Sequence, residues 1–207
     1  MEMTKHLDRL FERRPELRSC AGEIQQVVAM LQQCFQSGHR AYFCGNGGSA
    51  ADADHWAGEL LKGFYSKRRL SAEDRQRLPS SMADQLQGGL PAIPLTGFTA
   101  LRTAVANDIL AELEFAQLVW ALGQPGDVLV GLSTSGKARN VIAAAEVAHA
   151  RGMSMIGFTG RGGGELKNVA DLCVRTPSDT THEIQEHHLA IYHAVSLTLE
   201  DAFFPAG

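Results

Sequence analysis

Five short apolar runs recur along this chain of 207 residues and constrain its fold more than any other feature. They lie at residues 41–44, 92–95, 128–132, 153–158 and, more weakly, 172–174. Their apolar residues are nearly continuous, which is typical of strands buried on both faces. Helical patterns separate several of the runs, notably at residues 49–64, 138–150 and 181–203. This alternation predicts an α/β fold, a doubly wound parallel sheet sandwiched by helices.

The first 37 residues carry a different pattern, because their apolar residues recur at helical spacing. Leu7 to Phe11 belong to one such stretch and Ile24 to Phe35 to another, and Pro15 marks a break between them. The length suits one domain. We therefore expect a single domain over residues 1–207 that begins with an N-terminal helical segment, residues 1–37.

Residues 65–89 interrupt the alternation with a long polar segment of mixed charge, which we call the excursion. Ser71 stands three residues before Asp74, a spacing that can cap the start of a short helix. The segment is either a solvated surface loop or a lid or subunit-interface element, since long loops in compact domains are often functional.

The charge balance and the cysteines narrow the class of protein. The 19 basic and 23 acidic residues give a net charge of −4, which argues against a dedicated nucleic-acid binder. Four cysteines without a C-x-x-C pair favour reduced thiols over disulfides or a cysteine zinc site. Neither a signal peptide nor a membrane-spanning run is visible. We expect a cytoplasmic protein without nucleic-acid or membrane partners.

The loop after the first apolar run is rich in glycine, with Gly45, Gly47 and Gly48 followed by Ser49 at the start of a helix. Such a loop can turn its N–H groups toward an anion or a polar sugar, and the helix N-terminus adds positive potential. The spacing also fits the dinucleotide fingerprint. That fingerprint expects an acidic residue at the end of the next strand, and residues 95–98 contain none.

The loop after the third apolar run places three hydroxyl side chains, Ser133 to Ser135, before Gly136 and Lys137. With the helix expected from Ala138, it makes a phosphate cradle. Residues 131–137 also match a P-loop, but Ala138 replaces the Ser or Thr that would hold magnesium. The pattern therefore predicts a phosphate-bearing substrate that is not a nucleotide.

Histidines and carboxylates fall on two of the expected helices. His55 and Glu59 are four residues apart and share a helix face, and Gln185 and His193 lie on one stripe of the last helix. Imidazole and carboxylate groups are ligands for a divalent metal such as zinc. Each pair alone is more often a surface pair or a core histidine, and spacing does not show whether the two helices meet.

Taken in order, these motifs resemble the phosphoheptose isomerases of the sugar isomerase (SIS) domain superfamily. The resemblance runs from about residue 20 to the end and is carried by residues 44–49, His55, Glu59, Asn107-Asp108, residues 126–129, 133–136, 159–163 and 184–188.

The resemblance implies roles for individual residues. The zinc ligands would be His55, Glu59, Gln185 and His193, and Glu59 and His193 would be the catalytic acid–base pair. The substrate contacts would be Asn46, Gly47, Gly48, Ser49, Asn107, Asp108, Ser133, Thr134, Ser135 and Gln185.

The resemblance also implies a reaction and an assembly. Members convert sedoheptulose 7-phosphate to an aldoheptose 7-phosphate through an enediol, and the product enters lipopolysaccharide or other heptose-containing glycans. They form homotetramers with active sites at subunit interfaces.

The chain departs from the family pattern at three places. These departures concern the identity of the sugar more than the type of reaction. The serine loop ends in Lys137-Ala138 instead of Asn-Ser, and we expect Lys137 to contact the substrate phosphate in place of the lost hydroxyl. Gly63 stands where the family has arginine, with Lys62 beside it. The excursion is longer than the usual connection.

The alternative from another class is a non-catalytic SIS protein, either a phosphosugar-binding regulator or an adaptor of the replication initiator. Replication-associated relatives lack the complete glutamate–histidine pair. This chain retains Glu59 and His193, which favours the enzyme. An isomerase for another sugar phosphate, or an enzyme acting on an amino sugar, is a further alternative that the sequence does not separate from a heptose isomerase.

Overall fold

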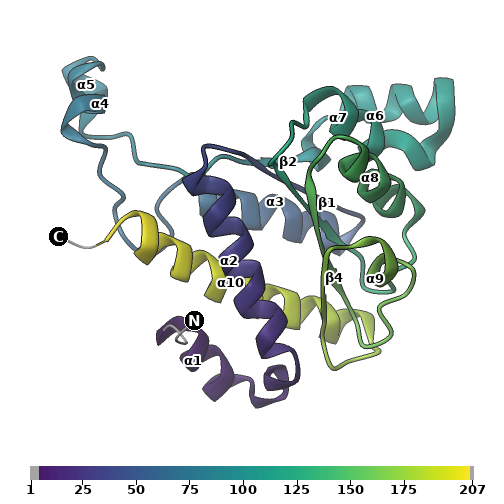
Figure 1. Cartoon of the computed structure of the whole chain (residues 1–207). Helices are drawn as coiled ribbons and strands as arrows, with labels where there is room; N and C mark the ends of the chain where they lie inside the picture. The colour runs from purple at the N-terminus through teal and green to yellow at the C-terminus, as the bar shows by residue number, and fades with distance from the viewer. Residues whose placement is uncertain (1–4, 206–207) are drawn as a thin grey trace.

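The computed structural model describes residues 5–205, and a five-stranded parallel sheet forms its centre (Figure 1). The strand order is β2-β1-β3-β4-β5, and the strands are β1 (Ala41–Gly45), β2 (Ala92–Pro94), β3 (Val128–Leu132), β4 (Ser154–Thr159) and β5 (Leu172–Arg175). Each strand ends within one residue of the predicted apolar run. The prediction of a parallel sheet is confirmed.

The strand order reverses between β1 and β3. From β1 the chain moves outward to the edge strand β2, then crosses back to β3 on the other side of β1. Gly45 at the end of β1 pairs with Leu132 at the end of β3, so the loops that follow these two strands leave the sheet side by side. Ligands of open α/β sheets bind at such a switch point.

Helices cover both faces of the sheet, as the predicted sandwich requires. One layer contains α1 (Lys5–Arg13), the 3₁₀ segment η1 (Pro15–Cys20), α2 (Ala21–Gln36), α3 (Gly48–Leu61) and α10 (Thr181–Phe203). The other contains α7 (Glu114–Leu122), α8 (Arg139–Ala150) and the short α9 (Leu166–Val169). Figure 1 shows α2 and α10 on one side of the sheet and α7 and α8 on the other.

Adjacent residues of β1 supply the two cores. Phe43 packs against Trp56 of α3, with ring centroids 5.1 Å apart. Tyr42 points to the opposite face, where its hydroxyl donates to the carbonyl of Leu122 over 3.0 Å. Both faces of this strand are buried, which explains its continuous apolar run.

The segment between β2 and β3 contains irregular helices that the sequence pattern does not predict. After the 3₁₀ turn η2 (Leu95–Gly97) come α6 (Thr99–Val105), the π-helical turn η3 (Ala106–Leu110) and the 3₁₀ turn η4 (Ala111–Leu113). These pieces are too short, and too different in their turn geometry, to sustain a 3.6-residue period.

The excursion forms two short helices, α4 (Ala72–Gln76) and α5 (Ser80–Ala83), which stand away from the sheet in Figure 1. The expected cap is present, because the Ser71 hydroxyl accepts a hydrogen bond from the Asp74 N–H over 3.0 Å. Within residues 5–205, no helix has both the length and the apolar character needed to cross a bilayer.

Candidate active site

The glycine loop and the serine loop meet at the switch point of the sheet. Gly47 has φ +55°, a left-handed conformation that favours glycine, and it directly precedes α3. Gly136 has φ +64°, and a Cβ there would lie 2.0 Å from the Gly163 carbonyl oxygen. Both turns therefore require glycine.

A pair of asparagine side chains ties the two loops together. The Asn46 amide donates to Oδ1 of Asn140 over 2.8 Å, and the Asn140 amide donates back to Oδ1 of Asn46 over 2.9 Å. Asn140 also donates to Glu114 over 2.7 Å. Asn140 belongs to the site but not to the predicted set, because a polar residue in the first turn of α8 gives no signal in the sequence.

The serine-loop hydroxyls accept hydrogen bonds from the backbone just before α8. The Ser133 hydroxyl accepts from the Ala138 N–H over 3.4 Å, and the Ser135 hydroxyl accepts from the Lys137 N–H over 3.2 Å. Each hydroxyl keeps its own proton for an anion. The helix begins at Arg139, one residue later than predicted, and Lys137 is exposed beside its first turn.

The predicted pair Asn107 and Asp108 lies in the π-helical turn η3. The Asn107 amide donates to Oδ1 of Asp108 over 2.7 Å, and both residues are exposed. An amide and a carboxylate held next to each other suit the hydroxyl groups of a sugar, which both donate and accept.

The structure brings together the histidines and the glutamate of two separate helices. One ligand atom from each of His55, Glu59 and His193 lies within 4.8 Å of the others. Nε2 of His55 is 2.9 Å from Oε1 of Glu59, and the rings of His55 and His193 are 5.1 Å apart. The question that spacing alone left open, whether the two helices meet, is thereby answered.

A hydrogen-bonded chain orients His55 from behind. Its Nδ1 lies 2.9 Å from the Tyr192 hydroxyl, which is 3.3 Å from Oδ1 of Asp52. If Nδ1–H donates to Tyr192, the hydroxyl donates onward to Asp52. The lone pair of Nε2 then faces the Glu59 carboxylate, and these two atoms repel unless a proton or a metal cation lies between them.

Burial, followed by the neighbouring His55, lowers the pKa of His193, so its imidazole is neutral at neutral pH. Nε2 of His193 is buried without a hydrogen-bond partner among residues 5–205. An unpartnered imidazole nitrogen beside His55 and Glu59 fits a metal ligand. His55, Glu59 and His193 could therefore hold a divalent metal ion.

Gln185 lies elsewhere on the same stripe of α10. It stands eight residues before His193, about 12 Å along the helix axis at 1.5 Å per residue. Its amide packs against the glycine loop, where a Cβ on Gly48 would lie 2.5 Å from Nε2 of Gln185. This contact explains the glycine at position 48 and places Gln185 beside the predicted substrate loop.

The remaining histidines of α10 do not join the cluster. His188 is fully buried, and its Nε2 lies 3.3 Å from the Thr159 carbonyl oxygen. His187 is buried and lies 3.5 Å from a carboxylate oxygen of Glu16. His182 is exposed at the start of the helix. His187 and His188 are therefore core histidines.

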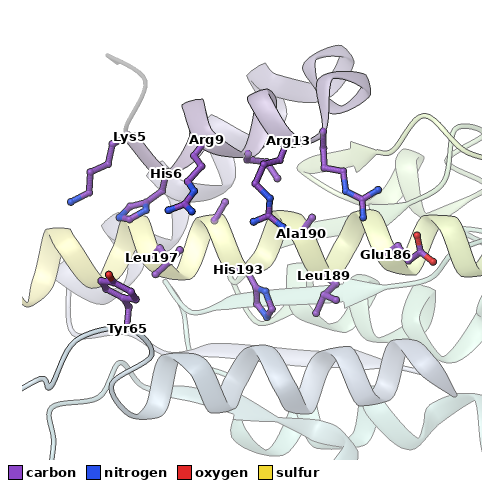
Figure 2. A pocket seen from close by; sticks show the side chains of 13 residues that line it. Lys5, His6, Arg9, Arg13, Tyr65, Glu186, Leu189, Ala190, His193 and Leu197 are labelled. Carbon is purple, nitrogen blue, oxygen red and sulfur yellow. The ribbon is translucent and has the colours of Figure 1, made fainter.

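A cavity of about 640 Å³ lies beside His193, between α1 and α10. Figure 2 shows Lys5, Arg9 and Arg13 extending from α1 toward α10, and His193 extending from α10 toward the other side. The predicted site did not include these cations. Their signal is present in the sequence, because residues 5, 9 and 13 recur every four positions and share one helix face.

Gly63 has a structural reason for departing from the family arginine. A Cβ at this position would lie 2.2 Å from the Ser66 carbonyl oxygen and 2.6 Å from the Gln87 side chain. The Gly63 N–H donates to that same Gln87 side chain over 2.8 Å. Residues at the base of the excursion therefore pack against position 63, where only glycine fits.

Comparison with known proteins places this geometry in a family. A family model of the SIS domain matches residues 87–160. The phosphoheptose isomerase of Akkermansia muciniphila is 42% identical over 184 residues, which are 89% of this chain and 87% of the relative. That of Rhodospirillum rubrum is 42% identical over 186 residues, which are 90% and 89%.

Comparison with solved structures gives the same family as comparison of the sequences. The phosphoheptose isomerase of Neisseria gonorrhoeae superposes with a TM-score of 0.76 at 33% identity over 95% of both chains. That of Francisella tularensis gives 0.77 at 32% identity over 91% of both chains. The parallel sheet with its glycine and serine loops therefore defines a SIS-domain protein. Within that class, the chain belongs to the phosphoheptose isomerase family and is an isomerase.

Proposed function

We propose that the protein interconverts sedoheptulose 7-phosphate and D-glycero-D-manno-heptose 7-phosphate. The convergence of Glu59, His55 and His193 within 4.8 Å carries the proposal, because it supplies a carboxylate and a neutral imidazole at one place. The phosphoheptose isomerases that align with nearly the whole chain support the choice of substrate.

In this mechanism Glu59 removes a proton from the carbon next to the carbonyl and returns it to the neighbouring carbon. The enediol forms between the two transfers. His193 moves the second proton between the two sugar oxygens, a role that needs an imidazole able to accept it. The lowered pKa of His193 keeps the ring in that form at neutral pH.

The two loops hold the rest of the substrate. Ser133, Thr134 and Ser135 with the start of α8 would bind the phosphate, and Lys137 adds a positive charge at its edge. The sugar hydroxyls would contact the glycine loop, from Asn46 to Ser49, and Gln185. Asn107 and Asp108 would reach the sugar from η3.

His55, Glu59 and His193 would hold a zinc ion, and Gln185 would become a fourth ligand by turning its amide from the glycine loop toward this cluster. The unpartnered nitrogen of His193 and the short contact between His55 and Glu59 support this assignment. When bound, zinc would polarise sugar oxygens as a Lewis acid.

We further propose a homotetramer in which a second chain completes each active site. The cations of α1 line a cavity next to His193, and no ion pair within residues 5–205 involves Arg9 or Arg13. Large apolar side chains are also exposed, including Ile109 at 63% and Trp120 at 56%. Subunit contacts in such an assembly would cover exposed apolar side chains of this kind.

The cellular role follows from the substrate. We place the protein in the cytoplasm, a location that its four unpaired cysteines support, and its product in lipopolysaccharide or other heptose-containing glycans.

A panel of ketose phosphates with five to seven carbons tests the function. The proposal expects solvent deuterium to enter the carbon next to the carbonyl fastest with sedoheptulose 7-phosphate. Faster exchange into a shorter ketose phosphate would assign another sugar. No exchange into any of them would favour a non-catalytic sugar-phosphate binder.

A further inference from the structure

Arg68 is a buried arginine at the base of the excursion, although arginine side chains are almost never fully buried unless paired. Each of its nitrogen atoms donates a hydrogen bond. Nε donates to Oε1 of Glu200 over 2.8 Å, Nη1 to the Leu60 carbonyl over 2.6 Å and Nη2 to the Glu59 carbonyl over 2.8 Å.

Glu200, on the last turns of α10, is equally buried and equally satisfied. Its carboxylate accepts from the backbone N–H groups of Phe64, Tyr65 and Ser66 over 2.8–3.0 Å, in addition to Arg68. Burial alone would raise the pKa of Glu200, but these donors hold it below its usual value. The carboxylate is therefore charged, and it organises the whole turn that follows α3.

The Arg68–Glu200 ion pair is connected to both Glu59 and His193, the two residues of the proposed acid–base pair. Arg68 holds the backbone of Glu59 directly through its carbonyl. Glu200 fixes Phe64, whose ring lies 5.2 Å from the ring of His193. One buried ion pair thus links the end of α3, the following turn and the α10 face that carries His193.

Stability does not explain such a pair. Taking two charges out of water is costly, and well-packed apolar side chains of similar volume often stabilise a protein as much or more. What an arginine–carboxylate pair provides is directional contact, because the guanidinium donors are fixed in one plane. Here those donors define the position of the α3 end relative to α10.

We propose that Arg68 and Glu200 are positioning residues, which hold Glu59 and His193 in the relative orientation that proton transfer requires. This inference rests on the proposed function, and it assigns neither residue a contact with the substrate.

The decisive variant is the double substitution Arg68→Met/Glu200→Leu. Removing either charge alone would leave its partner buried without a counter-charge and would strongly destabilise the chain, whereas the double variant removes both charges. The substrate loops are untouched, so we expect KM to stay within about threefold while kcat falls about 10- to 100-fold. Arg77→Met, in the exposed ion pair of the excursion with Glu73, is the matched control and should retain wild-type kcat.

A second readout is independent of turnover. The imidazole ¹⁵N resonances of His55 and His193 report the arrangement of the cluster, and we expect them to move in the double variant but not in Arg77→Met. A folded double variant with wild-type kcat and wild-type resonances would overturn the inference. If the wild type turns over no sugar phosphate, the proposed function fails, and the resonances alone decide the positioning role.

If the double variant does not fold, Arg68→Lys takes its place. Lysine keeps the charge near Glu200 but cannot reach both carbonyls with one ammonium group. The inference expects a folded variant with reduced kcat and shifted imidazole resonances. Wild-type values of both would contradict it.

Discussion

Glu59 follows His55 by one turn of α3, and its Oε1 lies 2.9 Å from Nε2 of His55. Tyr192 occupies the other nitrogen of the same ring at 2.9 Å, and Asp52 lies behind Tyr192. This arrangement directs one imidazole nitrogen and one carboxylate toward His193 on α10. These three side chains could hold a metal ion, and this possibility leads to the first prediction.

Purified, untagged protein should carry about one zinc or similar divalent ion per chain. His55→Ala should lower the metal content and the midpoint of thermal unfolding, because it removes one of the ligands. His182→Ala, an exposed histidine at the start of the same helix as His193, is the control and should change neither. Elemental analysis and thermal scans with and without a chelator measure both. Metal-free protein that gains neither stability nor activity on reloading would refute the ligand assignment.

Lys137→Ala should weaken binding of the phosphorylated sugar about tenfold or more, the range expected for one lost charge-assisted hydrogen bond. Binding of the unphosphorylated sugar should stay nearly the same. Lys67→Ala, an exposed lysine of the excursion, controls for the change in net charge. Calorimetric titration with both sugars separates the two effects. Equal losses for the two sugars would show that Lys137 does not contact the phosphate.

The protein should behave as a tetramer at micromolar concentration, because the basic cavity beside His193 and the exposed Ile109 and Trp120 would face other subunits in the proposed assembly. Light scattering coupled to size exclusion gives the mass directly. A mass of one chain would exclude an active site shared between subunits.

His188 should make the stability depend on pH. Burial lowers its pKa to about 4, and its Nδ1 finds no acceptor within the described part of the chain, so protonation would create an unpaired buried charge. The unfolded chain, with a histidine pKa near 6.5, binds this proton between pH 6.5 and 4 while the folded chain does not. The free energy of unfolding should therefore fall by about 2 kcal/mol from pH 7 to pH 5.

Denaturant titrations at both pH values check this contribution. His188→Gln keeps an N–H donor for the Thr159 carbonyl but does not titrate, so its loss of stability on acidification should be smaller by that amount. His182→Gln should behave like the wild type. An identical pH dependence in His188→Gln and the wild type would contradict the account.

The sequence is informative where a local period or a backbone requirement leaves a trace. The buried strands, the two loops and the His55–Glu59 pair could be predicted, because strand burial, glycine turns and helical spacing are local. That His193 joins that pair could not be predicted, because it depends on how α3 packs against α10. The same holds for Asn140, whose partner Asn46 is 94 residues away.

The excursion shows the limit most clearly. Its polar composition allowed a solvated surface loop or a lid or subunit-interface element, and neither interpretation predicted that Arg68 at its base is fully buried. The partner Glu200 lies 132 residues further along, and nothing near either residue marks the pair. Buried charges of this kind can be found only when the fold is known.

The exchange of solvent deuterium into the substrate in Glu59→Gln tests the central claim most directly. Glutamine keeps the size and one carbonyl oxygen of Glu59, so the fold and much of the sugar-phosphate binding should survive. It cannot accept a proton at neutral pH, and general acid–base groups contribute about 10²–10⁴-fold in rate. The account predicts that exchange at the carbon next to the carbonyl falls by at least this factor, while calorimetry still detects bound sugar phosphate. Exchange at the wild-type rate in Glu59→Gln would contradict the assignment of Glu59 as the base.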